Sequence, residues 1–388
     1  MLAINPRKVF RATAAFALLV AAPTISRADS DELGWDPVHT WVFAVGLLQW
    51  EHSDVYPSFP AAMQDRRDTQ LVEFFRGAGV PDEQITYLKD AEATKARVQS
   101  EFRTLLHQTD ENDLFIFYFC GHGARDPDSE QTWFACYDAG DTYESAWSVR
   151  SIFTAIDNHF SGSRALLLAD CCHSGALYDE CRRRNRDDGD EELAYAALTS
   201  SYSHNTSTGN WTYTDSLLAG FRGEGQVDLN YDGVIELNEL AHYTDLELAF
   251  LEGQKSMFFS AAAFPAAAKL AWVENEAAPR VGQRIEVQWK DRWYKAKVID
   301  VDGDQVEVHY AGFDNSWNEW VGPYLSRPYQ PAQFAQGDKV EVQWQSDHKW
   351  YPATVQKAWY GLHLINYDSE DKSTNEWVGP ASIRLRTQ

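Results

Sequence analysis

The chain has 388 residues, which is enough for two or three domains that each bury a core of their own. Its 58 acidic and 34 basic residues give a formal net charge of −24 at pH 7. A nucleic acid is therefore not expected as a partner, because its phosphate backbone is also negative. The acidity favours solubility but does not identify a substrate.

The first 28 residues have the pattern of a secretory signal peptide. Arg7, Lys8 and Arg11 precede the apolar stretch 12–23, and small residues follow at the positions before a cleavage site. The apolar stretch is too short to span a bilayer, so no stable membrane anchor is expected, although an uncleaved anchor is the alternative. We expect an exported bacterial protein, either periplasmic or secreted.

Residues 38–272 alternate between predicted strands and helices. Strands are predicted at 41–48, 85–88, 114–119, 165–169 and 193–198, and helices at 61–76, after Thr94 and around 149–156. Such alternation is typical of an α/β domain in which a mostly parallel sheet is covered by helices on both faces. The five-residue apolar stretch at 165–169 is typical of a strand buried on both sides.

Two of these strands are followed by residues with nucleophilic or ionisable side chains. The strand at 114–119 runs into Cys120, Gly121, His122 and Gly123, and the strand at 165–169 runs into Asp-Cys-Cys-His-Ser-Gly at 170–175. The carboxyl ends of parallel strands face the crevice where ligands bind. If the two strands are neighbours, an imidazole lies beside a thiol, as nucleophilic cysteine catalysis requires.

These motifs, with His122 fifty residues before Cys172, resemble the catalytic motifs of metacaspases and related bacterial caspase-like peptidases. The resemblance covers roughly residues 38–270 and implies a caspase-like three-layer sandwich. It also implies that Cys172 is the nucleophile, that His122 is its acid–base partner, and that the backbone amides of Gly123 and Cys172 bind the oxyanion. Two core strands with incidental Cys and His residues are the alternative.

The same resemblance suggests a substrate preference. Asp170 stands two places before the nucleophile, where metacaspases have an acid that binds a basic P1 side chain. Asp68 resembles the second acid of that pocket, with Asp65 as a competing assignment. We therefore expect a cysteine endopeptidase that cleaves protein or peptide substrates after Arg or Lys. The alternatives are a catalytically silent scaffold that binds proteins through its C-terminal modules, and a peptidase with the same dyad that cleaves after another residue, as legumain-like relatives do.

A polar segment at 181–192 contains four arginines and follows the nucleophile. In the family that this chain resembles, the equivalent linker is often cut during maturation. Self-processing here and a solvated surface loop explain the composition equally well.

Residues 228–239 have the pattern of an EF-hand calcium loop. Gly233 is at loop position 6, and the Val234 carbonyl would supply a further ligand. Side-chain oxygens fall at loop positions 1, 3, 5, 9 and 12, namely Asp228, Asn230, Asp232, Glu236 and Glu239. Hard oxygen ligands favour calcium over zinc or copper, so calcium is the predicted cofactor. An acidic turn without metal is the alternative.

The sequence after residue 280 repeats itself. Residues 281–289 match 336–344 and residues 318–321 match 375–378, which predicts two small SH3-like β-barrels at 280–328 and 335–388. The repeats resemble Tudor or chromo-barrel modules, whose aromatic cages often bind methylated lysine or arginine through cation–π contacts.

The first repeat offers more aromatic residues for a cage than the second. Its candidates are Trp293, Tyr310, Phe313 and Trp317. The second repeat keeps Trp350, Tyr367 and Trp377 but has Glu370 and Thr374 in place of Phe313 and Trp317. We expect the pair to dock a peptide or a substrate, while aromatic core packing is the alternative.

Overall fold

The structure is a computed structural model, and it describes residues 34–386 apart from several short segments. Those segments are 186–192, 204–206, 231, 274–280, 290–291, 304, 323–324, 330–333, 345–346, 360–361, 369–374 and 380–381. The predicted signal peptide, most of the arginine-rich linker, Glu370 and Thr374 therefore lie outside the described residues. Within the described ranges, no helix has the length and apolar character needed to cross a membrane.

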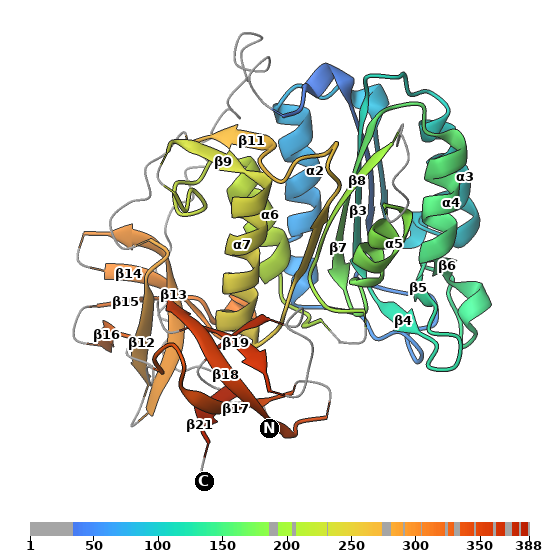
Figure 1. Cartoon of the computed structure of the whole chain (residues 1–388). Coiled ribbons are helices and arrows are strands. Elements are labelled where there is room, and N and C mark those ends of the chain that lie inside the picture. Colours follow the sequence, from blue (N-terminus) through green and yellow to red (C-terminus); the bar gives the residue numbers. More distant parts are fainter. Residues whose placement is uncertain are drawn as a thin grey trace.

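The largest element is a six-stranded sheet in the order β10-β8-β7-β3-β1-β2 (Figure 1). All neighbouring pairs are parallel except β10, which runs antiparallel to β8 at one edge. The strands are β1 (Thr40–Gly46), β2 (Ile85–Lys89), β3 (Leu114–Gly121), β7 (Arg164–Cys171), β8 (Ala194–Thr199) and β10 (Met257–Ser260). The mostly parallel sheet predicted from the sequence is confirmed.

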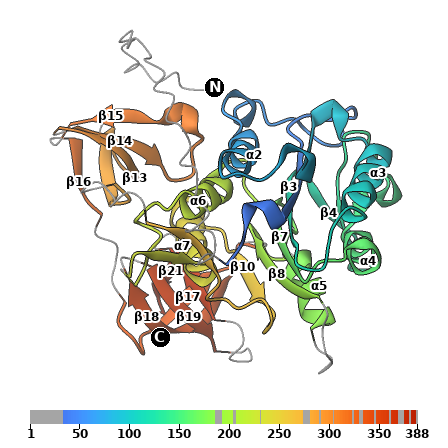
Figure 2. The same ribbon diagram turned by 90° about the horizontal axis from the view of Figure 1, so that it is seen from above.

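Helices cover both faces of this sheet, as the view from above shows (Figure 2). One face packs against α2 (Arg67–Gly77), α6 (Thr212–Phe221) and α7 (Leu237–Glu247). The other packs against α3 (Lys95–Leu106), α4 (Val149–His159) and α5 (Ala176–Arg184). Successive strand residues point to opposite cores, so an entirely apolar strand is buried on both sides. The three-layer caspase-like sandwich is confirmed.

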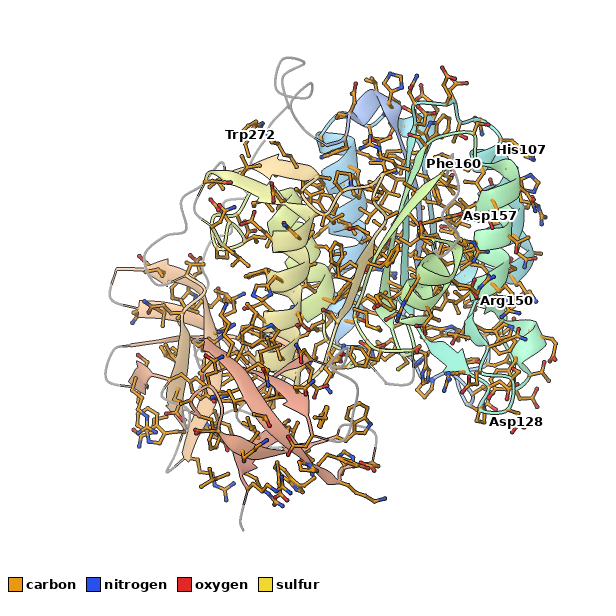
Figure 3. The ribbon with its side chains drawn as sticks, in the orientation of Figure 1. His107, Asp128, Arg150, Asp157, Phe160 and Trp272 are labelled. Carbon is orange, nitrogen blue, oxygen red and sulfur yellow. The ribbon has the colours of Figure 1, made fainter. Side chains whose placement is uncertain are left out.

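Smaller elements complete the core. A three-stranded sheet, β4 (Gly123–Arg125), β5 (Thr132–Phe134) and β6 (Trp147–Ser148), lies at the carboxyl ends of the central strands. Asp128 marks that end of the core, while His107 and Phe160 mark the opposite end (Figure 3). A second pair joins β9 (Val234–Glu236) to β11 (Lys269–Trp272), and a π-helical turn, η6 (Leu248–Glu252), follows α7.

Short 3-10 helices connect several of these elements. They are η1 (Pro37–His39), η2 (Ala62–Gln64), η3 (Asp82–Gln84), η4 (Asp90–Glu92), η5 (Tyr143–Ser145) and, in the C-terminal region, η7 (Asn315–Trp317).

Two five-stranded antiparallel sheets follow the core and form the two predicted barrels. The first barrel contains β12 (Arg284–Trp289), β13 (Arg292–Asp302), β14 (Gln305–Tyr310), β15 (Glu319–Val321) and β16 (Ser326–Pro328). The second contains β17 (Lys339–Gln343), β18 (Trp350–Trp359), β19 (Leu362–Tyr367), β20 (Glu376–Val378) and β21 (Ile383–Leu385). Each has a small core rich in valine.

Both barrels pack directly on the α7–η6 segment of the α/β core. Phe250 is buried in a cluster that includes Leu362 and Trp377 of the second barrel. Glu247 on α7 forms ion pairs with Lys297 at 2.6 Å and with Arg284 at 3.6 Å, both from the first barrel. Burial of these charges and apolar side chains ties the barrels to the core more firmly than a flexible linker would.

Candidate active site

The two polar strand ends predicted from the sequence are neighbours in the sheet. β3 and β7 pair in parallel with Gly121 opposite Cys171, so His122 and Cys172 are the next residues on two adjacent strands. Gly123 packs against the nucleophile segment so closely that a Cβ atom there would lie 1.8 Å from the Cys172 carbonyl oxygen. Only glycine fits this position, which brings the backbone of the histidine strand directly against Cys172.

The His122 ring is fixed by an aromatic wall. Its centroid lies 4.4 Å from that of Trp50, 4.6 Å from that of Phe59 and 5.6 Å from that of Tyr56. Nε2 lies 2.8 Å from the Pro57 carbonyl oxygen. Because a carbonyl oxygen only accepts, Nε2 carries the proton, and Nδ1 is the basic nitrogen of the neutral ring. Burial lowers the pKa of His122, and the bond to Pro57 opposes this in part.

The structure describes all five cysteines, and all five are free thiols. Cys172 is half-buried, whereas the other four are buried. The backbone N–H of Ser207 donates to its Sγ at 3.3 Å, and the Sγ lies 3.7 Å from the Ser207 carbonyl oxygen. Burial raises the pKa of Cys172, while the bonds to Ser207 lower it. The adjacent Cys171 is buried, and burial raises its pKa well above the ordinary value.

The turn after the nucleophile is bound to the segment that follows β8. His173 adopts a positive φ of 59° and its Nδ1 lies 3.0 Å from the Ser203 carbonyl oxygen. Ser174 is buried and shares hydrogen bonds with Ser201, including one from the Ser201 backbone N–H at 3.0 Å. These contacts hold the turn that carries Cys172 against the segment after β8.

Asp170 lines a small hollow at the carboxyl ends of β3 and β7. The cavity measures about 30 Å³ and its lining also includes Phe59, Cys120, Thr208 and Trp211. The Thr214 hydroxyl donates to the Asp170 carboxylate at 2.7 Å, and Tyr118 in turn lies 2.8 Å from Thr214. Burial raises the pKa of Asp170 to about 7, and the hydrogen bond from Thr214 opposes the shift.

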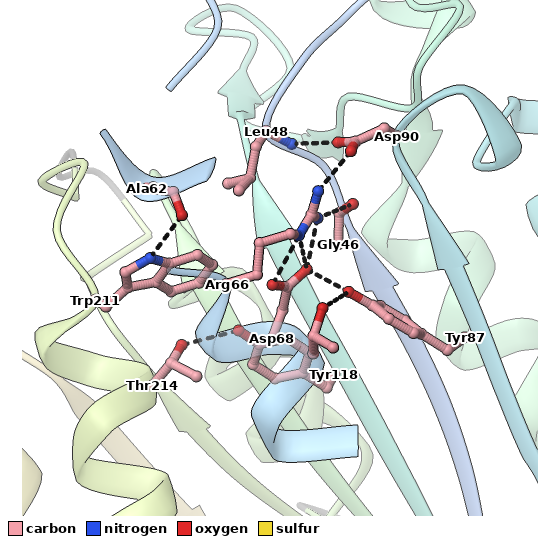
Figure 4. A network of polar contacts seen from close by, with 11 residues as sticks. Gly46, Leu48, Ala62, Arg66, Asp68, Tyr87, Asp90, Tyr118, Trp211 and Thr214 are labelled. Carbon is pink, nitrogen blue, oxygen red and sulfur yellow. Dashed lines mark hydrogen bonds and ion pairs between the residues drawn. The ribbon is translucent and has the colours of Figure 1, made fainter. Parts of the chain in front are cut away.

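Asp68, the predicted second acid of the pocket, lies outside the lining of this hollow. It is fully buried and is bound by the Arg66 guanidinium, with the shortest contact at 2.6 Å, and by the Tyr87 hydroxyl at 2.7 Å (Figure 4). Arg66 also bonds to Asp90 at 2.5 Å and to the Gly46 carbonyl oxygen at 2.9 Å. The Asp68 charge is therefore already compensated by an arginine of the same chain, and it does not line the hollow with Asp170.

The competing residue Asp65 is not a pocket acid in this structure either. Its carboxylate forms an ion pair with Arg67 at 3.0 Å and accepts from Gln70 at 2.9 Å, in a partly exposed position.

The predicted calcium loop is folded, but its carboxylates are not arranged around a common point. Glu239 accepts backbone N–H groups from Leu229 at 2.9 Å, Asn230 at 3.1 Å and Glu236 at 3.0 Å. The described residues contain no group of three or more Asp, Glu, His or Cys side chains positioned to hold a metal. The donor set has calcium chemistry, and in this structure the Glu239 carboxylate accepts backbone N–H groups of the loop.

Other contacts in the loop follow the predicted pattern. Asp228 accepts from the Gly233 backbone N–H at 2.9 Å, Asp232 accepts from the Val234 N–H at 3.0 Å, and Gly233 has a positive φ of 85°. The side-chain Oδ1 of Asn230 accepts from the Asp232 backbone N–H at 2.8 Å. The calcium site remains a prediction, since binding would require Glu239 to exchange its backbone bonds for the metal.

The first barrel brings together three of the four predicted cage residues. Tyr310 and Phe313 have ring centroids 6.2 Å apart, and Phe313 and Trp317 have centroids 5.5 Å apart. The fourth, Trp293, instead lies under the Arg327 guanidinium at 3.9 Å. Its place is taken by Tyr294, whose centroid is 6.2 Å from that of Phe313. Neighbouring strand residues face opposite sides, and the sequence did not reveal which of the two adjacent aromatics points inward.

The second barrel also uses aromatics other than those expected. Trp344 lies 5.5 Å from Tyr367 and 6.4 Å from Tyr351, between ring centroids. Trp350 instead stacks on Arg384 at 4.0 Å, and Trp377 is buried in the interface with the core. The alignment of the repeats, with Trp289 opposite Trp344, was the signal that could have identified Trp344.

Comparisons with known proteins agree with this architecture. Residues 78–181 match the family model described as metacaspase, peptidase C14 domain, and residues 337–388 match the Agenet domain. The first match contains both His122 and Cys172. No curated protein sequence matches this chain.

Three solved structures are similar to parts of the chain. Protein GSU0716 from Geobacter sulfurreducens is 15% identical with a TM-score of 0.39, over 57% of this chain and 93% of that one. AGD34 of AGDP1 from Arabidopsis thaliana is 22% identical with a TM-score of 0.13, over 28% and 82%. The SAWADEE domain of SHH1, solved with an H3K9me3 peptide, is 17% identical with a TM-score of 0.12, over 27% and 98%.

The family matches fall on the two parts of the fold where the motifs and repeats were found. The chain thus combines a segment of the metacaspase peptidase C14 type with a C-terminal Agenet domain, which is Tudor-like.

Proposed function

We propose that the protein is a cysteine endopeptidase that cleaves after arginine or lysine. The observation that carries this proposal is the half-buried thiol of Cys172 on the strand end beside His122, with Asp170 in the adjoining hollow. The metacaspase match supports the peptidase class, and Asp170 supports the basic preference.

The resting site holds a neutral thiol and a neutral imidazole. The pKa of Cys172 is raised and that of His122 is lowered, both mainly by burial. His122 therefore acts as a general base, taking the thiol proton as Sγ attacks the scissile carbonyl carbon. The resulting imidazolium then gives that proton to the leaving amine. Water hydrolyses the acyl-enzyme, with His122 again removing the proton.

The oxyanion formed in these steps requires donors at the same strand ends. The backbone amides of Gly123 and Cys172 are the proposed pair. The close approach of Gly123 to the Cys172 backbone supports this assignment, because a larger residue would force the two amides apart.

Asp170 is the proposed ligand of the P1 side chain. A carboxylate in a partly dry hollow attracts a guanidinium or an ammonium group and repels an acidic one. The pKa of about 7 means that this carboxyl loses its proton near neutrality, and a bound cation favours the charged form. Asp68, already paired with Arg66, is left out of this role.

Further parts of the proposal rest on the sequence. Residues 1–28 direct export to the periplasm or the medium, the loop at 228–239 binds calcium, and the segment 181–192 is a site of self-processing. The aromatic cluster of the first barrel, with Tyr294, Tyr310, Phe313 and Trp317, is the candidate site for docking a peptide. Export agrees with the calcium assignment, since calcium is plentiful outside the cytosol.

The test is to incubate residues 29–388 with short reporter peptides ending in Arg, Lys, Asp or Asn, with and without calcium. We expect turnover of the Arg and Lys reporters, and none by the Cys172→Ala variant. Turnover only after Asn or Asp would reject the basic preference. No turnover of any reporter by folded protein would favour the silent scaffold.

A further inference from the structure

Lys255 is a charged residue buried between the catalytic core and the second barrel. It follows η6 and is only 6% exposed. Its ammonium lies 4.4 Å from the centroid of Trp344, 5.9 Å from that of Tyr367 and 5.5 Å from that of Tyr202 on the catalytic core. It also forms an ion pair with Glu376 of the second barrel.

The residues that the second barrel contributes form a binding site for an ammonium group. We call Trp344, Tyr367 and Glu376 the lysine site. The Tyr367 hydroxyl donates to Glu376 at 2.5 Å, as Tyr310 donates to Glu319 at 2.8 Å in the first barrel. Aromatic faces and a carboxylate compensate a desolvated ammonium, so the lysine site binds a side chain of its own protein.

Gln254, the residue before Lys255, is bound to the segment that covers the nucleophile. It is 1% exposed, and its Nε2 donates to the Ser200 carbonyl oxygen and, at 3.1 Å, to the Ser207 hydroxyl. Its Oε1 accepts from the Thr208 backbone N–H at 2.8 Å. Ser207 in turn donates its backbone N–H to Cys172 Sγ, and Thr208 lines the hollow with Asp170.

The segment restrained by Gln254 borders the active site. The hollow at Asp170 measures about 30 Å³, whereas a cavity of roughly 150 Å³ accommodates benzene, so this part of the site is narrow. Both polar backbone groups of Ser207 also contact Cys172 Sγ. Movement of the wall carrying Ser207 and Thr208 would therefore widen the hollow and uncover Cys172 Sγ.

We infer that the second barrel is a latch on the active site. Its lysine site binds Lys255 of the same chain. This contact fixes the neighbouring Gln254, whose hydrogen bonds hold Ser207 and Thr208 in place. Release of Lys255 lets the wall open and exposes Cys172. A protein or peptide with an accessible lysine is the class of ligand that would compete for the lysine site. The inference rests on the proposed peptidase function, but the accessibility of the Cys172 thiol can be measured independently of peptidase activity.

The experiment measures alkylation of Cys172 by iodoacetamide, read by mass spectrometry, in full-length protein. The main variant is Lys255→Met with Glu376→Gln, which removes both charges of the ion pair. The matched control is Lys339→Met, which removes another lysine–carboxylate pair of the second barrel, the exposed contact with Asp368 at 3.3 Å. A second variant, Gln254→Met, keeps the lysine site and cuts its connection to Ser207 and Thr208.

Local opening should raise the alkylation rate about tenfold in both the double variant and Gln254→Met, and leave it unchanged in the control. The kcat/KM for an Arg reporter should rise in parallel. An unchanged or slower alkylation rate in either variant, with a native circular dichroism spectrum, would overturn the latch. If the double variant does not fold, Gln254→Met decides alone. Faster alkylation without any peptidase activity would support the latch and reject the proposed function.

Discussion

Replacing Asp170 with asparagine should stabilise the fold and impair the enzyme. Burial raises the pKa of Asp170 from 3.8 to about 7. At about 1.4 kcal/mol per unit, keeping this carboxylate charged in the folded state costs up to roughly 4 kcal/mol. An asparagine side chain carries no charge and can still accept the Thr214 hydroxyl, so the Asp170→Asn variant avoids that cost.

The sign of the effect depends on pH. A carboxyl whose pKa is higher in the folded state contributes stability below its unfolded pKa and loses it as pH rises through the folded value. Wild type should therefore lose stability between about pH 4 and 7 relative to the Asp170→Asn variant. At pH 8 the variant should have the larger free energy of unfolding, by roughly 1–4 kcal/mol, and the difference should vanish near pH 3.

Activity should change in the opposite direction. Loss of the charge-assisted contact with P1 should lower kcat/KM for Arg and Lys reporters about a hundredfold, or roughly 3 kcal/mol. In wild type, kcat/KM for these reporters should rise as pH increases through about 7, because the carboxylate form binds the cation.

Urea unfolding at pH 4, 6 and 8, paired with reporter kinetics over the same range, measures both effects. A variant that is less stable than wild type at pH 8 would show that interactions with Asp170 stabilise its charged form by more than burial destabilises it. Retained turnover of Arg reporters would show that another group binds P1.

Four further outcomes are expected. Cys172→Ala should abolish peptidase activity while Cys171→Ala keeps most of it, measured with an Arg reporter; equal loss would mean that the wrong thiol is assigned. Gly123→Ala should lower kcat about a hundredfold, because its methyl group collides with the Cys172 carbonyl, and normal turnover would remove Gly123 from the oxyanion site. Glu239→Ala should abolish calcium binding measured by calorimetry, and a wild-type protein, folded and metal-free, that gives no heat with millimolar calcium would refute the site. Deleting residues 275–388 should lower the melting temperature, because Glu247 and Phe250 lose their partners; an unchanged melting temperature would mean that the barrels are independent modules.

The central sheet could be predicted because its strands are long apolar stretches separated by helical periodicity. The edge strand β10 was not predicted, since Met257–Ser260 is short and half-buried along its whole length. Parallel pairing also made the proximity of His122 and Cys172 predictable, because the two residues follow adjacent strands of the sheet. Neither conclusion required knowledge of side-chain conformation.

Of the two predicted pocket acids, only Asp170 has a position that follows from the sequence pattern. Asp170 follows its strand directly, so its position depends only on the sheet. Asp68 depends on where the Arg66 side chain points and on Asp90, more than twenty residues away, which no local pattern reveals. A buried acid beside an arginine of the same chain is neutralised in place, and its charge is not available to a substrate.

The barrels show a contact that depends on residues still farther apart in the sequence. Repeat alignment places Tyr310 opposite Tyr367 and Glu319 opposite Glu376, and the structure pairs them identically. In the second barrel this carboxylate also pairs with Lys255, which lies 121 residues before Glu376. The site in the second barrel thus binds a side chain of its own chain, and this contact depends on the packing of the barrel on the core rather than on any local pattern.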